Sequence, residues 1–289
     1  MVYLRELYLP DGDKEFDYIV NNIKRKCYNT LYPFKILSQK QLSYLEFEPI
    51  TILYGGNGSG KTTLLNIIAE KLKLTRGTIG NSSSFFEEYL KLCACNIKGG
   101  AIPQASRIIT SDDVFDFVLK LRMLNEGVDD KREKLFAEYL QMRQQRPPRE
   151  NILQKSNELK KIVAAQSMTQ SMYVKRNLGL NLKEESNGES AFAYFREKIS
   201  ENALYLLDEP ENSLSPERQM QLVDFLAESA RFFGCQFIIA THSPFVLALK
   251  GAKIYDLDEY PVTTKKWTQL HNVRVYYEFF QKYRAEFEK

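Results

Sequence analysis

One stretch of this sequence constrains the fold more than any other, the run "ITILYGGNGSGKTTLLNIIAEKLK" from Ile50 to Lys73. Its first residues are apolar, β-branched or aromatic, which is typical of a strand, and this strand ends at two glycines. A helix is expected from Lys61 to about Lys73, because apolar residues recur there at helical spacing. A strand, a glycine-rich turn and a helix in this order predict an α/β fold.

The turn between these two elements matches the pattern G-x-x-x-x-G-K-[ST]. Backbone amides can surround a phosphate only where side chains do not block the approach, and a helix N-terminus adds unpaired N–H groups. We expect Lys61 to contact the β- and γ-phosphates of a nucleotide and the Thr62 hydroxyl to contact Mg²⁺. The expected nucleotide-binding loop comprises Gly55, Gly56, Asn57, Gly58, Ser59, Gly60, Lys61, Thr62 and Thr63.

Two acidic residues follow a second apolar run, in "ALYLLDEPENSLSP". The run suits a strand buried on both faces, and an open α/β sheet binds its ligands at the carboxyl ends of its strands. Asp208 can hold Mg²⁺, and Glu209 can act as general base on an attacking water. Neighbouring carboxylates at a phosphate site would repel each other without a cation, so the pair predicts a metal ion. The simpler alternative is an acidic turn before Pro210.

A histidine follows a third apolar run, in "FIIATHSPF". A lone histidine is more often structural, but His242 stands directly after a predicted buried strand, as the acidic pair does. An imidazole in that place can donate a hydrogen bond to a γ-phosphate and report its presence. We therefore take Glu209, His242 and Lys61 as the candidate catalytic residues.

A short polar segment, "ESNGES", precedes the acidic pair by 22 residues, counted from 186 to 208. Ser186 can cap the helix expected to follow it, and Gly188 lets the backbone approach an anion. Taken alone, the segment indicates only the start of a helix. Its place in the order of the motifs makes Ser186, Gly188 and Glu189 candidate nucleotide ligands.

A charged segment with few glycines, residues 113–185, lies between the nucleotide-binding loop and the acidic pair. It predicts a helical subdomain inserted into a single domain that spans residues 1–289. Two helical stretches separated by Pro147 and Pro148 favour an antiparallel hairpin. Basic residues gather near this turn and would suit DNA or RNA phosphates, although a solvated helix face explains them more simply. They are Arg143, Arg146, Arg149, Lys155, Lys160 and Lys161.

Helices alternate with buried strands in the rest of the chain, which predicts a sheet with crossover helices. Residues 76–112 look irregular apart from a short strand in "SRIIT", because turn-forming residues crowd them. The last helix, in "VRVYYEFFQKY", is rich in aromatic residues. We expect it to pack on the core rather than to form a partner surface.

The composition argues against several classes of protein and of site. A net charge of +3 predicts neither nucleic-acid nor membrane binding by the molecule as a whole. No run of about 18 apolar residues is present, so no membrane insertion is expected. The first residues do not resemble a signal peptide, and the four cysteines are expected to be reduced thiols of a cytoplasmic protein. The two histidines lack the spacing of a zinc site.

The order and spacing of these motifs resemble the ATP-binding-cassette (ABC) ATPases, P-loop proteins with a mixed sheet and an inserted helical subdomain. In that family ATP lies between the P-loop of one subunit and the signature loop of another, which implies a homodimer formed through ATP. The resemblance makes residues 55–63 the Walker A loop and residues 186–189 the signature loop. It makes Asp208 and Glu209 the Walker B pair with the catalytic glutamate, and His242 the switch histidine.

The sequence departs from the family pattern in two loops. In the signature loop, Glu185 stands where the family usually has leucine, and Asn187 where it often has glycine. The glutamine of the family's Q-loop is either Gln104 or is replaced by Ser111 and Asp112. We favour the second reading, because the helical subdomain starts there.

The segments "DEPENSLSP", whose Ser213 matches the family's D-loop, and "ATHSPF" are similar to a cytosolic branch of the superfamily. That branch contains the AAA-type ATPases grouped with RecF, SMC and the OLD nuclease ATPases. It implies an ATPase that drives or gates an effector protein, or acts on DNA or RNA, in nucleic-acid processing or bacterial defence. The alternatives are the nucleotide-binding subunit of a transporter and an ATP-binding switch that does not hydrolyse. Tyr32 and Phe34, upstream of the P-loop, are expected to be core residues rather than an adenine-stacking site.

Overall fold

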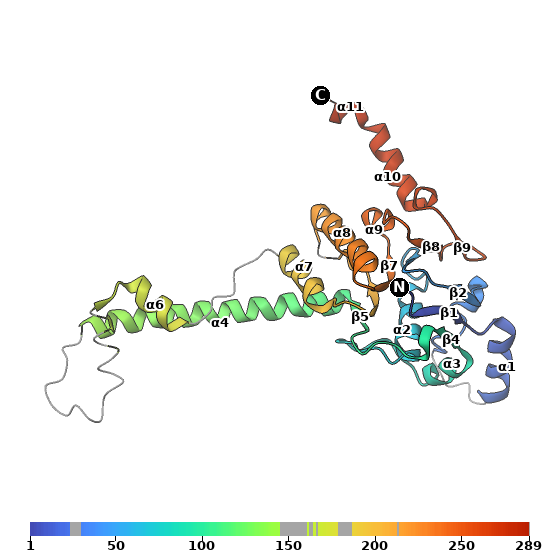
Figure 1. The fold of residues 1–289 in the computed structure, drawn as a ribbon, viewed down its shortest axis with the longest axis horizontal. Helices are drawn as coiled ribbons and strands as arrows, with labels where there is room; N and C mark the ends of the chain where they lie inside the picture. Colours follow the sequence, from blue (N-terminus) through green and yellow to red (C-terminus); the bar gives the residue numbers. More distant parts are fainter. Residues whose placement is uncertain are drawn as a thin grey trace. The chain divides into compact units, whose positions relative to one another are not determined.

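A computed structural model of the chain describes two compact units, coloured along the chain in Figure 1. The described residues are 1–23, 30–144, 161, 164–165, 167–178, 187–212 and 214–288. One unit comprises residues 1–115 together with 187–289, and the other comprises residues 116–186. The expected inserted subdomain, residues 113–185, corresponds to the second unit in position, and its role as a separate functional part stays a prediction.

The first unit contains a six-stranded sheet in which the three motif-bearing strands are neighbours. The strand order is β5-β6-β7-β3-β8-β9, and every pairing is parallel except that of β8 with β9. Ala240 of β7 pairs with Leu53 of β3 on one side and with Asp208 of β6 on the other, so the three carboxyl ends are level. The strands are β3 (Ile50–Tyr54), β5 (Arg107–Thr110), β6 (Leu204–Asp208), β7 (Gln236–Thr241), β8 (Lys253–Asp256) and β9 (Thr263–Thr264).

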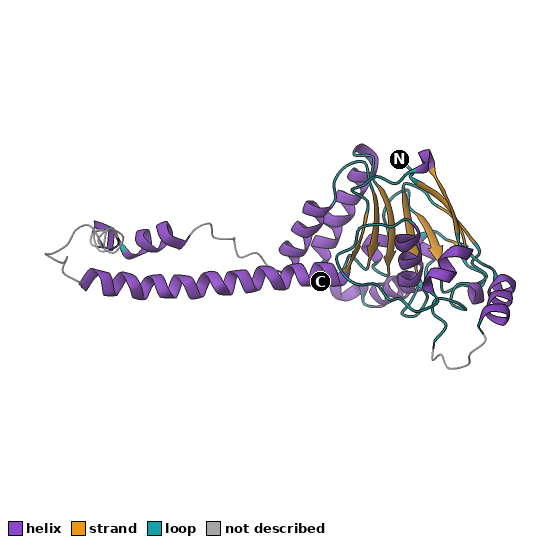
Figure 2. Ribbon diagram, turned by 90° about the horizontal axis from the view of Figure 1, so that it is seen from below, coloured by secondary structure: helices purple, strands orange, loops and turns teal. Residues whose placement is uncertain are grey.

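Both faces of this sheet are covered, which explains why its central strands are apolar throughout. On one face, Leu64 and Ile68 of helix α2 (Lys61–Lys71) pack against Leu206 and other sheet residues. Helices on the two sides of the strands are visible in Figure 2. Further helices of this unit are α7 (Asn187–Lys198) and α8 (Pro216–Phe232), which contact each other through Phe192 and Phe225.

A second, three-stranded sheet joins the core on the side of α2. Its order is β2-β1-β4, and both pairings are antiparallel. The strands are β1 (Leu4–Tyr8), β2 (Tyr44–Glu46) and β4 (Ala94–Ile97). The expectation that residues 76–112 are irregular apart from β5 is therefore wrong, because α3 (Phe86–Leu92), β4 and the short η2 (Lys98–Gly100) lie there. Local patterns miss β4 because its partner, β1, lies far earlier in the chain and because exposed and half-buried residues alternate along β4.

The C-terminal aromatic helix is expected to pack on the core, but most of its residues are not buried. Helix α10 (His271–Lys282) buries only Val273 among its residues. Tyr277, Phe279 and Phe280 are each about half exposed, so the expectation of core packing is wrong. The remaining short helices of this unit are α1 (Gly12–Asn22), η1 (Ser38–Lys40), α9 (Pro244–Leu247), η3 (Trp267–Gln269) and α11 (Arg284–Phe287).

The second unit is helical where the structure describes it. Its helices are the part of α4 (Ser111–Gln144) from residue 116 on and α6 (Gln170–Leu178). A small core forms where Tyr139 and Tyr173 pack together. The Pro-Pro turn of the expected hairpin lies outside the described residues, as do most of the basic residues near it. Of those basic residues, Lys161 pairs with Glu138.

Two further properties of the described part of the chain concern membrane-spanning helices and cysteine thiols. None of its helices combines the length and the apolar character that crossing a membrane requires. Cys93, Cys95 and Cys235 are free thiols. Burial raises the pKa of Cys93 to about 12, so its thiolate is disfavoured at neutral pH.

Candidate nucleotide-binding and hydrolysis site

The loop between β3 and α2 is the expected phosphate-binding cradle, and it needs glycine at two positions. Gly55 has φ 158°, and a Cβ atom there would lie 2.6 Å from the Ser59 hydroxyl. Gly60 has φ 97°, in the left-handed region, and a Cβ atom there would lie 3.2 Å from both Ile36 and Leu37. The glycines therefore allow the chain to turn sharply into α2, whose first N–H groups open towards the cradle.

Lys61 begins α2 and is held against the loop that precedes it. Its side chain is buried, with 5% of the residue exposed. The Lys61 ammonium donates to the carbonyl of Gly55 at 2.7 Å and to that of Gly56 at 3.0 Å. The same loop is anchored by Asp258, whose carboxylate accepts a hydrogen bond from the Gly56 amide at 2.8 Å. Sequence reasoning missed Asp258, which follows β8 with no local pattern pointing to the P-loop.

The residues of this loop fit a phosphate group. The Ser59 hydroxyl is buried and has no hydrogen-bond partner within the described structure. A Cβ atom on Gly58 would meet nothing within 4 Å, so the approach to the loop is open there. An unpaired hydroxyl, a lysine and the N–H groups of a helix start are donors that an anion can satisfy together.

The hydroxyl of Thr62 meets the carboxylate of Asp208 across the sheet. Thr62 Oγ1 donates to Asp208 Oδ1 at 3.2 Å, which joins the start of α2 to the end of β6. Burial, with the nearby charge of Glu209, raises the pKa of Asp208 to about 6. These two hard oxygen ligands fit Mg²⁺, and a divalent cation would relieve the unfavourable burial of the carboxylate. The described residues contain no cluster of three or more His, Cys, Asp and Glu side chains that could hold a metal by itself.

Glu209 lies in a strained turn directly after β6. Its φ is 48°, a left-handed conformation that is uncommon for a residue with a Cβ atom and often found at functional sites. Its amide donates to the carbonyl of Ala240 at 2.9 Å, and its Oε2 accepts from the Asn212 side chain at 3.1 Å. The turn aims the carboxylate at His242, whose Nδ1 lies 3.6 Å from Glu209 Oε1.

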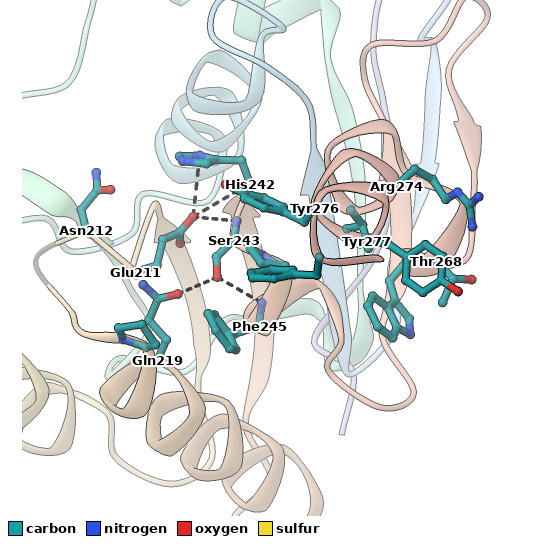
Figure 3. Close-up of a pocket in the computed structure, with 15 residues that line it drawn as sticks. Glu211, Asn212, Gln219, His242, Ser243, Phe245, Thr268, Arg274, Tyr276 and Tyr277 are labelled. Carbon is teal, nitrogen blue, oxygen red and sulfur yellow. Dashed lines mark hydrogen bonds and ion pairs between the residues drawn. The ribbon is translucent and has the colours of Figure 1, made fainter. Parts of the chain in front are cut away.

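The switch corner after β7 rests on a residue that sequence reasoning missed, Glu211. Figure 3 shows its carboxylate beside His242 and Ser243. Its Oε1 accepts from the Thr241 hydroxyl at 2.6 Å and from the backbone amides of the two following residues. A cavity of about 810 Å³ lies on the α10 side of this corner, and no P-loop residue lines it. The sequence signal for Glu211 is its position as the third acidic residue of "DEPEN", a segment in which Glu209 is the predicted functional glutamate.

The proposed signature loop is described only in part. Ser186 lies outside the described residues, and Asn187 and Gly188 begin α7. Glu189, in the first turn of α7, forms an ion pair of 2.8 Å with Arg218 of α8. Ser213 of the expected D-loop also lies outside the described residues. The roles of these residues stay predictions.

The two readings of the Q-loop fall at opposite ends of β5. Gln104 precedes β5, whereas Ser111 and Asp112 follow it. Because β5 runs parallel to β6, only the second pair lies at the sheet edge where Asp208 ends β6. Strand direction thus favours Ser111 and Asp112.

The upstream aromatic residues occupy the core side of the P-loop region. Phe34 is buried and makes an edge contact with Tyr89. Tyr32 is partly buried and stacks on Phe86 of α3. Both therefore contribute to packing, as expected.

Asp208→Asn is expected to stabilise the nucleotide-free chain near neutral pH by about 1 to 3 kcal/mol. The pKa of Asp208 is raised from 3.8 to about 6 in the folded chain, so wild-type stability should fall as pH rises from about 4 to 6, where the unfolded chain has lost this proton and the folded chain still holds it. Asparagine can still accept from Thr62 and has no charge to bury. Thermal denaturation at pH 4.5 and 7.5 measures the effect, with exposed Asp224→Asn as control. An asparagine variant less stable than wild type at pH 7.5 would contradict the argument.

Comparison with known proteins agrees with this geometry. Residues 174–247 match a family described as AAA ATPase domain, and this range includes Asp208, Glu209 and His242. No curated protein shows significant sequence similarity to the chain.

Solved structures with low identity to the chain include SMC heads and an ABC protein. The SMC head domain of Thermotoga maritima is 14% identical, with 88% of this chain and 94% of that chain covered and a TM-score of 0.37. An Smc head of Pyrococcus furiosus bound to part of ScpA is 14% identical, with 98% and 100% covered and a TM-score of 0.42. An ATP-binding cassette bound to ADP and Pi is 14% identical, with 78% and 90% covered and a TM-score of 0.36.

Three features of the chain itself fit a P-loop ATPase. The Walker A sequence lies between a strand and a helix, Thr62 contacts Asp208, and the strand carrying His242 lies between the other two motif strands. The family match covers the acidic pair and the histidine. The chain therefore has the α/β fold of a P-loop ATPase, and its residues 174–247 are similar to the AAA ATPase domain.

Proposed function

We propose that this chain binds MgATP and hydrolyses it to ADP and phosphate. The observation that carries the proposal is the meeting of three side-chain groups at the level ends of β3, β6 and β7. These groups are Lys61, the Thr62–Asp208 pair and the Glu209–His242 pair. Together they supply a cation for phosphate, oxygen ligands for Mg²⁺, and a base with a neighbouring imidazole.

The residues take separate roles in the proposed reaction. Glu209 accepts a proton from the attacking water. The oxygen of this water bonds to the γ-phosphorus while the bond from the γ-phosphorus to the β,γ-bridging oxygen breaks. Lys61 leaves the carbonyls of Gly55 and Gly56 and neutralises charge on the phosphates. Thr62 and Asp208 hold Mg²⁺, which when bound balances the charge of the β- and γ-oxygens. His242 contacts the γ-phosphate and reports its presence.

We further propose that a second copy of the chain completes the site. Ser186, Gly188 and Glu189 of that copy would meet the γ-phosphate from the open side of the P-loop. The Glu189–Arg218 ion pair supports this role, because it ties the first turn of α7, where Gly188 and Glu189 lie, to α8. ATP would then hold a homodimer together, and hydrolysis would release it.

The dimer would drive or gate a partner in the cytoplasm, an effector protein or DNA or RNA, in nucleic-acid processing or bacterial defence. This part of the proposal rests on the resemblance of "DEPENSLSP" and "ATHSPF" to the cytosolic branch of the superfamily. Added DNA, RNA or a candidate effector should change the rate of ATP hydrolysis if it is the partner on which the dimer acts.

Phosphate release and light scattering on the full chain test the function directly. We expect phosphate release that needs both ATP and Mg²⁺ and that stops with a chelator. We also expect a monomer without nucleotide and a dimer with a non-hydrolysable ATP analogue and Mg²⁺. A chain that binds ATP but releases no phosphate with any of these partners would instead be an ATP-dependent switch.

A further inference from the structure

The corner that carries His242 is held from two sides by buried polar contacts. From α8, Gln219 accepts a hydrogen bond of 2.7 Å from the Ser243 hydroxyl, which also caps α9. From the turn after β6, Glu211 Oε1 accepts from the Thr241 hydroxyl at 2.6 Å and from the amides of His242 and Ser243 at 3.1 and 3.2 Å. The backbone on both sides of the imidazole is therefore fixed to side chains from other elements (Figure 3).

The position of the Glu211 carboxylate suggests a role beyond holding the backbone of this corner. Only 5% of the residue is exposed, and its second oxygen, Oε2, is buried without a hydrogen-bond partner in the described structure. The two lone pairs of a neutral amide oxygen would suffice for the Thr241 hydroxyl and the His242 amide. The Ser243 amide also donates to the Thr241 hydroxyl at 3.0 Å, so the anchor does not by itself need a buried charge. The buried charge lies 3.7 Å from the imidazole Nδ1, measured to Glu211 Oε1.

Two carboxylates of one turn, separated by a single residue, face the same ring nitrogen. His242 Nδ1 lies 3.6 Å from Glu209 Oε1 and 3.7 Å from Glu211 Oε1. Negative charge on that side favours a hydrogen on Nδ1, which orients the ring and selects its tautomer while no nucleotide is bound. A γ-phosphate at the other side of the ring favours a second hydrogen on Nε2, so that Nε2 can donate to a bound nucleotide while Nδ1 faces the carboxylates. Glu209 is the more exposed of the two and is assigned to water, whereas Glu211 stays buried.

We propose that Glu211 is the positioning residue of the switch histidine. It holds the backbone of the Thr241–Ser243 corner and, through its charge, keeps the hydrogen of His242 on Nδ1. The inference rests on the proposed hydrolysis for its effect on rate, but its effect on the imidazole exists without nucleotide. Glu211 acts through His242 and does not touch the reacting atoms.

Glu211→Gln tests the charge separately from the anchor, because the amide oxygen can still accept from the Thr241 hydroxyl and the His242 amide, and the Ser243 amide keeps the Thr241 hydroxyl as an acceptor. We expect the variant to lose about 10-fold to 100-fold in kcat for ATP, with KM changed less than about twofold, since only the orientation of His242 is disturbed. Glu217→Gln, an exposed carboxylate in the first turn of α8, is the matched control and should leave both constants unchanged.

Histidine NMR provides a readout that a purely structural role would not move. The chain has two histidines, so ¹⁵N-labelled imidazoles give two sets of ring signals, which His242→Ala assigns. In the nucleotide-free full chain, Glu211→Gln should shift the His242 ring signals towards the other tautomer and leave those of His271 in place. Unchanged His242 signals in a folded variant would overturn the proposal.

A double variant checks that Glu211 acts through the histidine. Glu211→Gln combined with His242→Ala should be no slower than His242→Ala alone, because the residue to be positioned is gone. Independent losses that multiply would overturn the proposal. A wild-type chain without ATP turnover would refute the proposed hydrolysis, whereas the ring signals would still decide the role of Glu211.

Discussion

Glu209→Gln is expected to reduce the rate of ATP hydrolysis by about 10²-fold to 10⁴-fold, because glutamine cannot accept the proton of the attacking water. The amide has nearly the shape of the carboxylate and can still accept from the Asn212 side chain, so the turn at φ 48° should persist. ATP should therefore still bind. If hydrolysis opens the proposed dimer, the variant should accumulate as an ATP-bound dimer, seen by light scattering with ATP and Mg²⁺.

The control for this variant is the exposed Glu217→Gln on α8, which should hydrolyse ATP like wild type and show no trapped dimer. Two outcomes would contradict the assignment of Glu209. Hydrolysis at the wild-type rate would remove its role as base. A monomer at saturating ATP and Mg²⁺, with hydrolysis lost, would leave the base in place but argue against a dimer held by nucleotide.

The parts of the site that the sequence predicts are those in which one short segment contains all the necessary chemistry. The strand, the glycine turn, Lys61 and Thr62 are contiguous, and their spacing alone implies a phosphate cradle. The acidic pair and His242 each follow a continuous apolar run, and such runs indicate buried strands. Parallel strands place their carboxyl ends at one edge, so the meeting of these groups also follows from local patterns.

The features that the sequence does not predict depend on partners far along the chain. Strand β4 is half-buried and is defined by its pairing with β1. Asp258 reaches Gly56 across about 200 residues, and Glu211 reaches the corner after β7 from the turn after β6. In each case the residue type is ordinary, and only the tertiary arrangement gives it a role. The aromatic pattern of α10 likewise does not reveal which of its faces another element covers.

These hidden contacts have a common electrostatic consequence for the site. Asp208, Glu209 and Glu211 bring three carboxylates to the end of β6 and the turn after it, and the pKa of Asp208 is raised by its burial and by the charges of the other two. The ammonium of Lys61 opposes this effect. The nucleotide-free site therefore has unfavourable negative charge in its interior, which a magnesium ion would relieve. This balance of charges explains why removing the positive charge of Lys61 should have a larger effect than the loss of its hydrogen bonds alone.

Lys61→Met is expected to weaken MgATP binding and hydrolysis together, by about 100-fold or more. The variant keeps most of the buried aliphatic chain but removes the positive charge that meets the phosphates. It also leaves the carbonyls of Gly55 and Gly56 without the donor that now binds them, which should cost about 1 to 3 kcal/mol of stability. Fluorescent ATP titration gives the affinity, and thermal denaturation without nucleotide gives the stability.

The exposed Lys120→Met on α4 serves as the control, because it removes a positive charge from the surface and leaves the P-loop intact. Its affinity and turnover should equal those of wild type. Adding MgATP should raise the melting temperature of wild type and of the control, but not of Lys61→Met, since a ligand stabilises only the fold that binds it. A folded Lys61→Met chain that still gained stability from MgATP at wild-type concentrations would show that this lysine does not hold the nucleotide. The phosphate cradle would then lie elsewhere in the chain.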